Sequence, residues 1–320
     1  MRKKRYLFLI IGLVLIVLVS SCTSKDVVVE NKNSSKKVQE ESKLSKEDDL
    51  EKIMIQFKTL ISENKEPDEV VEFIDENIEK VSKKESVDMI KEFEKLQENY
   101  IALYTEELHK ENRQQTLAKL YPNSDIDPKK IEEIKDEELK KIISKMIKGR
   151  YKIVNEEGFY FPKIDYEIFK KYEKNLSDEL KEYLNIKVVE SDSPAIIDGE
   201  ITVSWDELGN RLIKIEKYLT KYPKGIKCEE VMRIYGEYLV MYMSGSDNTP
   251  IYNAKDKKIK KDIFDNYKKI VSNNKDTITA NVINEYMKII EKNNHISDSV
   301  VTSRLVELYN EAIGRFEECE

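Results

Sequence analysis

Apolar residues recur every three or four positions through most of the chain after Ser45, which is the spacing of one face of an α-helix. The first such face carries Leu50, Ile53, Met54, Phe57, Leu60 and Ile61. Pro67 opens a second stretch, and a third runs over about 84–120 until Pro122 disfavours further helix. Three amphipathic helices with short connections predict an antiparallel bundle over residues 46–122.

A turn-rich segment at 122–128 marks the predicted domain boundary, so residues 123–320 are expected to form a larger α domain. Within it, two short β-favouring pieces near 151–164 and 195–203 predict hairpins, the second around the turn dipeptide Asp198-Gly199. Helical periodicity predicts the remaining helices at about 128–149, 165–184, 204–222, 227–243, 256–272, 277–293 and 298–317. The expected fold class is mainly α, a helical bundle or solenoid-like series of helix pairs with one or two short β-hairpins.

Two segments have a similar pattern of residues that end one helix and begin the next. Residues 216–239 read EKYLTKYPKGIKCEEVMRIYGEYL, a helix ending in Tyr-Pro, a turn and a second amphipathic helix. This pattern resembles a tetratricopeptide-type helix pair, and residues 116–139 are punctuated in the same way around Pro122. Pro122 and Pro223 are 101 positions apart, whereas tandem repeats of that family recur every ~34 residues. Isolated helix pairs and a repeat scaffold both fit the sequence.

The beginning of the chain has the order of a secretory signal peptide. Four basic residues at positions 2–5 precede an apolar run from Leu7 to Val19, and Ser20 and Ser21 follow directly. At about 1.5 Å per residue, this helix would be about 20 Å long, short of the roughly 30 Å hydrocarbon core of a bilayer. A permanent membrane-spanning helix is therefore the weaker interpretation.

The residues Val19-Ser20-Ser21-Cys22 resemble the lipobox of bacterial lipoproteins, with Val19 where that family usually has Leu. The resemblance implies that residues 1–21 are a signal peptide cleaved by a type II signal peptidase and that Cys22 is lipidated, with palmitate among its acyl chains. It also implies a place on the extracytoplasmic face of the cell membrane. An uncleaved signal anchor is the alternative. Residues 22–45 lack periodicity and predict a disordered tether after the lipidated Cys22.

Charge excludes one class of partner. The chain has 55 basic and 62 acidic residues, a net charge of −7. Cleavage of the first 21 residues would remove four basic residues and make the net charge still more negative. Such an acidic chain lacks the basic footprint that nucleic acid requires. It would also be repelled by anionic lipid, so the expected membrane attachment is the lipid anchor alone.

Cysteine pairing is undecided by the sequence. Besides Cys22, the chain has Cys228 and Cys319, which are 91 positions apart. In an extracytoplasmic protein such a pair either forms a disulfide or remains as two independent thiols.

We recognise no catalytic motif in the sequence. His109 and His295 stand alone without a metal-ligand spacing, and no GxSxG, GxGxxG or P-loop pattern occurs. Acidic pairs such as Asp206/Glu207 fit the first turns of helices, where they complement the helix dipole. We therefore expect neither cofactor nor metal and a non-enzymatic binding or scaffold protein at the cell surface. A substrate-binding lipoprotein of a transporter and a cell-wall-associated enzyme are the alternatives.

Aromatic residues are the remaining candidates for recognition. The chain has 18 tyrosines, of which three fall on one helical face, and the loop 244–250 is rich in small polar residues. The candidate partner-binding residues are Tyr235, Tyr238, Tyr242, Phe159 and Trp205. Exposed aromatic rings stack on sugars or anchor protein partners, so a protein or a cell-wall polymer is the expected partner. Core packing with hydroxyls that reach water is the competing explanation.

Overall fold

Prolines and small polar caps set the beginnings of the first helices in the computed structural model, which describes residues 48–316 and 319. Residues 48–62 are helical, and Pro67 opens α2 (Pro67–Asn77) as predicted. Ser82 caps α3 (Lys83–His109) by accepting a hydrogen bond from the amide of Glu85. The predicted signal peptide, Cys22 and the tether up to residue 45 lie outside the described residues.

Three stretches that were predicted as single helices are divided in the structure. The stretch 84–120 forms α3 and α4 (Arg113–Leu120), with Glu111 at a positive φ of 50° between them. The stretch 128–149 forms a 3-10 helix, η1 (Pro128–Glu133), and then α5 (Glu137–Lys148). The stretch 165–184 forms a second 3-10 helix, η2 (Tyr166–Asn175), before α6 (Asp178–Asp192).

A new cap explains two of these divisions. Asp136 Oδ1 accepts from the amides of Glu138 and Leu139, each at 3.1 Å, and so starts α5. Ser177 Oγ accepts from the amide of Leu180 at 3.2 Å and starts α6. Such caps satisfy amides that a new helix would leave unpaired. Because α6 continues to Asp192, the helix ends eight residues later than its predicted end at about residue 184.

Both predicted hairpins are present. Strands β1 (Tyr151–Glu156) and β2 (Phe159–Ile164) pair antiparallel, in a register from Tyr151↔Ile164 to Glu156↔Phe159. Strands β3 (Ile196–Ile197) and β4 (Glu200–Ile201) make a second, shorter pair. Each turn consists of two residues with positive φ, and the second of them is Gly158 or Gly199. This is the geometry that a tight type I′ turn needs, and it explains both glycines.

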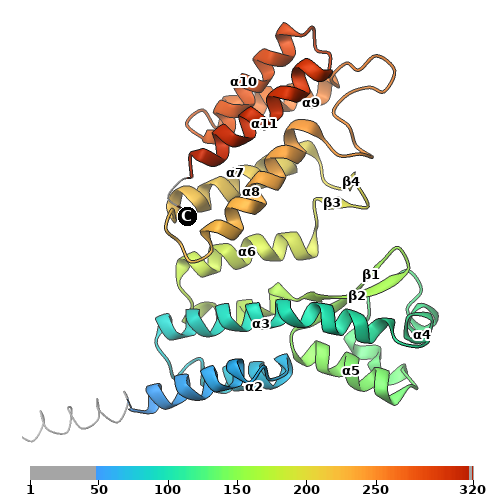
Figure 1. The fold of residues 1–320 in the computed structure, drawn as a ribbon, viewed down its shortest axis with the longest axis vertical. Coiled ribbons are helices and arrows are strands. Elements are labelled where there is room, and N and C mark those ends of the chain that lie inside the picture. The colour runs from blue at the N-terminus through green and yellow to red at the C-terminus, as the bar shows by residue number, and fades with distance from the viewer. Residues whose placement is uncertain (1–47, 317–318, 320) are drawn as a thin grey trace, which may run out of the picture. The chain divides into compact units, whose positions relative to one another are not determined.

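The C-terminal half consists of helices that pack on their neighbours in the chain. They are α7 (Trp205–Lys221), α8 (Cys228–Ser244), α9 (Lys261–Asn273), α10 (Ile278–Lys292) and α11 (Ser299–Gly314). α7 packs on α8, and α10 packs on both α9 and α11, while α11 returns to contact α8 (Figure 1). The segment 216–239 therefore forms the helix pair expected of it, whereas 116–139 holds only the end of α4, η1 and the start of α5.

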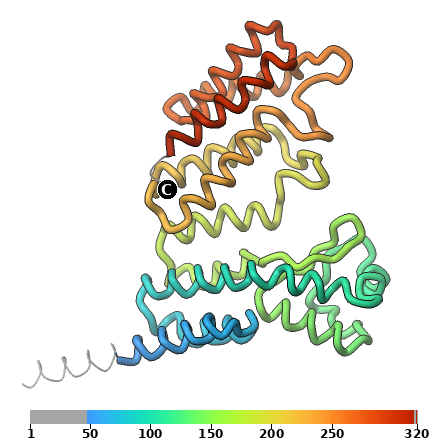
Figure 2. The backbone as a smooth tube through the Cα atoms, in the orientation of Figure 1, coloured from blue at the N-terminus to red at the C-terminus, as the bar shows by residue number. Residues whose placement is uncertain are grey.

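From Asp49 onward the chain forms one compact unit with a contiguous apolar core. The predicted boundary at 122/123 lies inside this unit, because α2 contacts α5 and β2 contacts α3 across it. The path of the backbone can be followed in Figure 2, where the green segment that holds α5 comes back beside the blue α2. The fold is mainly helical, with two two-stranded antiparallel sheets among the described residues. None of the helices in this part of the chain is long and apolar enough to cross a membrane.

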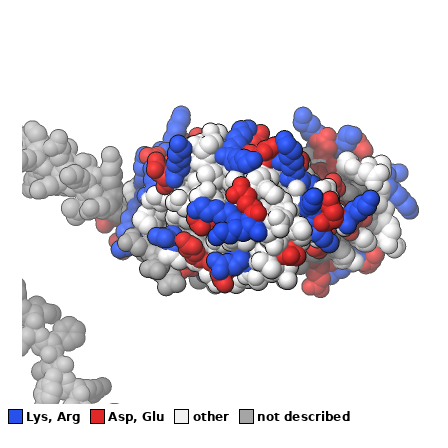
Figure 3. Space-filling view, turned by 90° about the horizontal axis from the view of Figure 1, so that it is seen from above, with Lys and Arg blue, Asp and Glu red and all other residues white. Residues whose placement is uncertain are grey.

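Surface charge is mixed. The face seen in Figure 3 carries Lys and Arg side chains interspersed with Asp and Glu, with uncharged surface between them. Many of these charges are paired along one helix, as Lys181 is with Asp178 at 3.0 Å and Lys261 with Asp265 at 3.0 Å. Pairs of this kind keep the local field small although the chain as a whole is acidic.

A disulfide joins Cys228 at the start of α8 to Cys319 near the end of the chain, with their Cα atoms 5.3 Å apart. Of the two arrangements that fit the sequence, the structure thus has the paired one. The 91-residue separation encloses α8 to α11, so the bridge fixes both ends of this group of helices together.

We expect Cys228→Ser to lower the free energy of unfolding by about 2–5 kcal/mol, because the bridge restricts a long loop in the unfolded chain. Guanidinium unfolding followed by circular dichroism measures this. Reduced wild type and Cys228→Ser should then coincide, and Cys319→Ser should add nothing to Cys228→Ser. Equal stability of oxidised wild type and the variant would contradict the bridge.

Candidate functional site

The three candidate tyrosines of α8 belong to the core. Tyr235, Tyr238 and Tyr242 are exposed by only 0%, 2% and 0%. Their hydroxyls are satisfied internally: Tyr242 donates to Asn266 Oδ1 at 2.5 Å, Tyr238 donates to Glu190, and Tyr235 bonds Thr279 Oγ1 at 3.0 Å. Of the two explanations that the sequence left open for this face, the structure shows core packing, since periodicity identifies a face without showing what covers it.

The two other candidates lie apart from each other. Trp205, the first residue of α7, is partly buried and packs against the core. Phe159 begins β2 and is 52% exposed, with its ring stacked on that of His109 at a centroid distance of 6.3 Å. Phe161 also contacts His109, so a small exposed aromatic patch lies where the first hairpin meets the end of α3. The structure does not bring the five candidates together.

The structure does gather a buried group of charges that the sequence did not reveal. We call it the ionic cluster; it consists of Glu94, Glu98, Tyr166, Tyr183, Lys187, Lys227 and Glu230. At its centre the side chain of Glu94, 2% exposed, meets Lys227 Nζ at 2.5 Å. Tyr166 and Tyr183 donate their hydroxyls to the same carboxylate.

Glu230 forms the other half of the ionic cluster. Its carboxylate meets Lys187 Nζ at 2.7 Å and Lys227 Nζ at 3.1 Å. The two ammonium groups also lie over aromatic rings, Lys187 5.0 Å from the centroid of Tyr166 and Lys227 4.7 Å from that of Tyr183. These contacts connect α3, η2, α6 and the start of α8 in one network.

Titration in the ionic cluster follows from these contacts. Burial opposes ionisation of Glu230, but Lys187 and Lys227 outweigh it and lower its pKa to about 2. Burial would lower the pKa of Lys227, yet Glu94 and Glu230 raise it above its ordinary value. Loss of hydration and the carboxylates of Glu94 and Glu230 raise the pKa of Glu98. At neutral pH Lys227 is thus protonated and Glu230 ionised, so the two form a charged pair.

The contacts of the ionic cluster favour a structural role over metal binding or catalysis. Oxygens of Glu94, Glu98 and Glu230 lie within 4.8 Å of one another, as the ligands of a cation do. Two lysine ammonium groups already stand against these carboxylates, so a metal ion would meet like charge. A lysine held protonated is also a poor nucleophile or base. We therefore assign a structural role to the ionic cluster.

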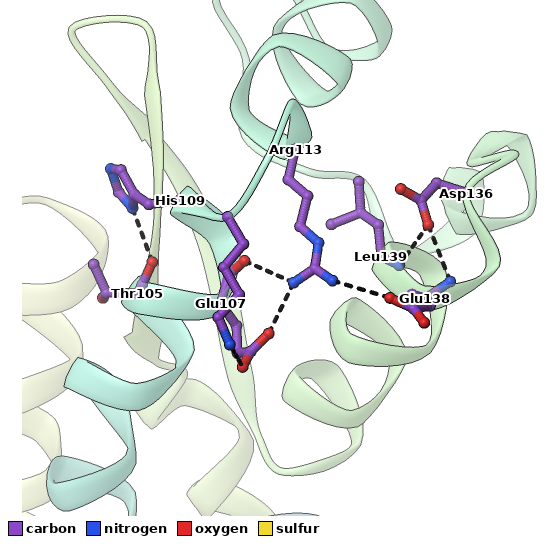
Figure 4. Close-up of polar contacts among 8 residues, drawn as sticks. Thr105, Glu107, His109, Arg113, Asp136, Glu138 and Leu139 are labelled. Atoms are coloured by element: carbon purple, nitrogen blue, oxygen red, sulfur yellow. Dashed lines mark hydrogen bonds and ion pairs between the residues drawn. The ribbon is translucent and has the colours of Figure 1, made fainter.

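A second buried charge, Arg113, explains the division between α3 and α4. Its Nη1 donates to the carbonyl of Glu107 at 2.9 Å and to Glu107 Oε2 at 2.8 Å (Figure 4). Its Nη2 lies 3.4 Å from Glu138 Oε2, next to the amides that Asp136 caps. One guanidinium therefore holds the turn after α3 against the first turn of α5.

A wide hollow lies on the opposite side of α8 from its tyrosines. A hollow of about 890 Å³ runs between α8 and α11 and is closed at one end by the β3–β4 turn and the loop after α8. We call it the α8–α11 groove; its lining residues are Ile196, Gly199, Arg233, Gly236, Glu237, Val240, Met241, Gly245, Ser246, Asp247, Thr302, Leu305, Val306 and Tyr309. Three aliphatic side chains in it are exposed: Ile196, Val240 and Val306.

Two glycines shape this groove. A Cβ at Gly236 would lie 2.9 Å from the ring and the hydroxyl of Tyr309, so its absence lets α11 approach α8 closely. Gly245 ends α8 with φ 75°, and a Cβ there would lie 2.3 Å from the carbonyl oxygen of Thr249. The groove therefore depends on two positions where other residues would clash.

Sequence reasoning missed Val240 and Val306 as surface residues, although it singled out the loop 244–250 at the end of the groove. One signal was present. Tyr238 to Met243 are six consecutive apolar residues, which cover every side of a helix with 3.6 residues per turn. A helix that is apolar on every side is typically buried against other elements on every side. In this structure, however, the side of α8 that faces the groove is not covered by any other element that the structure describes.

We expect Lys227→Met to lower the free energy of unfolding at pH 7 by on the order of 3 kcal/mol, because it leaves Glu94 buried without its counter-charge. Lys288→Met removes a matched lysine from an exposed pair with Glu285 and should hardly change stability. Urea unfolding of both variants measures the difference. Equal stabilities of the two variants would contradict the structural assignment of the ionic cluster.

The same cluster predicts acid sensitivity. Glu230 has a depressed pKa of about 2 in the folded chain, against about 4.3 for a free glutamate, so its contribution is present above pH 4.3 and is lost as pH falls toward 2. Wild-type stability should decrease over this window, and the deficit of Lys227→Met should shrink there. A deficit that is constant from pH 7 to pH 2 would show that Glu230 does not depend on Lys227.

Comparison with protein-family models, with curated proteins and with solved structures finds no match to this chain.

Proposed function

We propose that this chain is a lipid-anchored lipoprotein on the extracytoplasmic face of the cell membrane, and that it works by binding a partner in the α8–α11 groove. The observation that carries the binding proposal is the exposure of Ile196, Val240 and Val306 in one preformed hollow. Soluble proteins rarely leave aliphatic side chains clustered in a concave surface unless something binds there.

The anchor rests on the first 22 residues and gains support from the disulfide. The basic, apolar and small-residue order ending in Cys22 is that of a lipoprotein signal. Disulfides persist in oxidising compartments and are rare in the cytosol, so the pair Cys228–Cys319 fits an extracytoplasmic location.

The geometry supports binding over the two alternatives. A transporter receptor with a hinged cleft would be built from strands alternating with helices, whereas the sheets of the described chain are two isolated hairpins. An enzyme would place perturbed titratable groups in an accessible hollow. Glu190 lines one beside Arg211, and burial raises its pKa, but its carboxylate already accepts the hydroxyl of Tyr238. Glu94 is buried and matched by Lys227 and two tyrosines. The α8–α11 groove offers aliphatic contact area and few charges, which suits recognition of an apolar surface.

Lipid attachment is tested with an alkyne fatty acid fed to cells that produce the full-length chain. The wild-type protein should take up the label and fractionate with membranes, and Cys22→Ser should lose both properties because it lacks the acceptor thiol. Cys228→Ser is the matched control, since it removes a cysteine outside the lipobox and should be labelled like wild type. Equal labelling of Cys22→Ser would refute the anchor.

Use of the groove is tested by photo-crosslinking on intact cells, with benzoylphenylalanine in place of one exposed residue at a time. Positions 240 and 306 in the groove should give the same adduct. Val300 is the matched control, because it is equally apolar and exposed on α11 but does not line the groove. Adducts from position 300 or from position 159, with none from 240 and 306, would place the binding surface elsewhere.

A further inference from the structure

One end of the α8–α11 groove is acidic. Asp247 lines it, and Asp198 precedes Gly199, which lines it as well. Both carboxylates are exposed, and neither forms an ion pair with any residue that the structure describes. The basic residue in the groove lining, Arg233, is engaged, because it pairs with Glu237 at 2.5 Å. Lys260 donates to the carbonyl of Pro250 rather than to a carboxylate.

These carboxylates stand on a fixed piece of backbone. Asn248 donates through its amide to the carbonyl of Gly199 at 3.1 Å and through Nδ2 to the carbonyl of Asp198 at 2.7 Å. Thr249 Oγ1 accepts from the amide of Ile201 at 3.0 Å. Three hydrogen bonds thus clamp the loop after α8 onto the β3–β4 turn. A charged group held in advance loses little entropy when a partner pairs with it.

The dimensions of the groove favour a helix as the occupant. Its lining on α8 runs over nine residues from Arg233 to Met241, and the eight steps between them span about 12 Å along the helix. A helix that docks through anchors at i, i+3 or i+4, and i+7 covers about 10.5 Å. An extended peptide would instead need a strand edge, and β3 and β4 are only two residues each. A helix lying between α8 and α11 completes ordinary three-helix packing.

We propose that the α8–α11 groove binds an amphipathic α-helix of another protein, with aliphatic anchors on one face and lysine or arginine at the end that reaches Asp247 and Asp198. This inference rests on the binding function proposed above and adds the chemistry of the partner. Val240, Val306 and Ile196 contact the anchors, and the two carboxylates set the direction in which the helix lies. Charge at the rim of an interface mainly fixes orientation and partner choice.

The test uses the full-length protein in lipid nanodiscs and three synthetic 18-residue helices that share four leucines at i, i+3, i+4 and i+7. They end in three lysines, three glutamines or three glutamates, and fluorescence anisotropy measures their binding. The lysine peptide should bind on the order of 10-fold more tightly than the glutamine peptide at low salt, with the glutamate peptide weakest. Added salt should reduce these differences.

Two sets of variants separate this inference from the proposed function. The double variant Asp198→Asn and Asp247→Asn should bind the lysine and glutamine peptides equally while keeping affinity for the glutamine peptide. Val306→Asp should lose all three peptides, and Val300→Asp should keep them. If wild type binds all three peptides equally and Val306→Asp binds none, the charge preference is refuted, whereas binding in the groove is supported. Absence of binding by any peptide would refute the helix as occupant, whatever the crosslinking shows. Self-association of the protein abolished by Val306→Asp would replace the partner helix with a second copy of this chain.

Discussion

The buried carboxylate of Glu94 is the constraint on which the rest of this structure depends. Amphipathic helices can stack in many slightly different ways at similar cost, because apolar contact is not directional. A carboxylate 2% exposed to water accepts far fewer arrangements, since it must meet its donors at short range. Here they come from η2, α6 and the start of α8, so one side chain of α3 fixes the positions of segments up to 133 residues further along the chain. Replacement by apolar residues of equal volume would often preserve stability, so we infer that the ionic cluster contributes specificity of packing rather than net free energy.

The groove inherits its shape from this constraint. Lys227 and Glu230 hold the first turn of α8 in the ionic cluster, and the adjacent Cys228 ties that turn to the segment that follows α11. In the middle of the groove, Gly236 allows Tyr309 to rest on the backbone of α8. At the far end the loop after Gly245 is clamped to the β3–β4 turn. Three separate attachments thus set the distance between α8 and α11, and the hollow between them does not depend on a bound partner for its form.

How far the sequence predicts this molecule depends on whether the deciding interaction is local. Caps and turns that act within four residues were legible, as Ser204 at the start of α7 and Asp198-Gly199 in the second hairpin show. The division between α3 and α4 was not legible, because Arg113 reaches from its own turn to Glu138 on another helix. For the same reason the sequence left both a binding face and core packing open for Tyr235, Tyr238 and Tyr242: their spacing is that of a face, and only the positions of other helices decide that this face is inside. Val240 is the reverse case, since an apolar helix residue is ordinarily counted as core and this one is exposed.

The distribution of charge decides which forces can act in recognition. A net charge of −7 would ordinarily suggest long-range attraction of basic partners. Most of the described ion pairs, however, join neighbours on one helix or lie at the surface. On the face seen in Figure 3, basic and acidic side chains are interspersed. Opposite charges a few ångströms apart cancel beyond a Debye length of about 8 Å at physiological salt. A partner is therefore not guided from a distance by the surface as a whole. It gains affinity only on contact, where Val240 and Val306 lose water, and the carboxylates left without a basic neighbour act at the same short range. In the proposed complex, the apolar side chains of the groove would supply the binding free energy, while Asp198 and Asp247 would select the orientation in which it is gained.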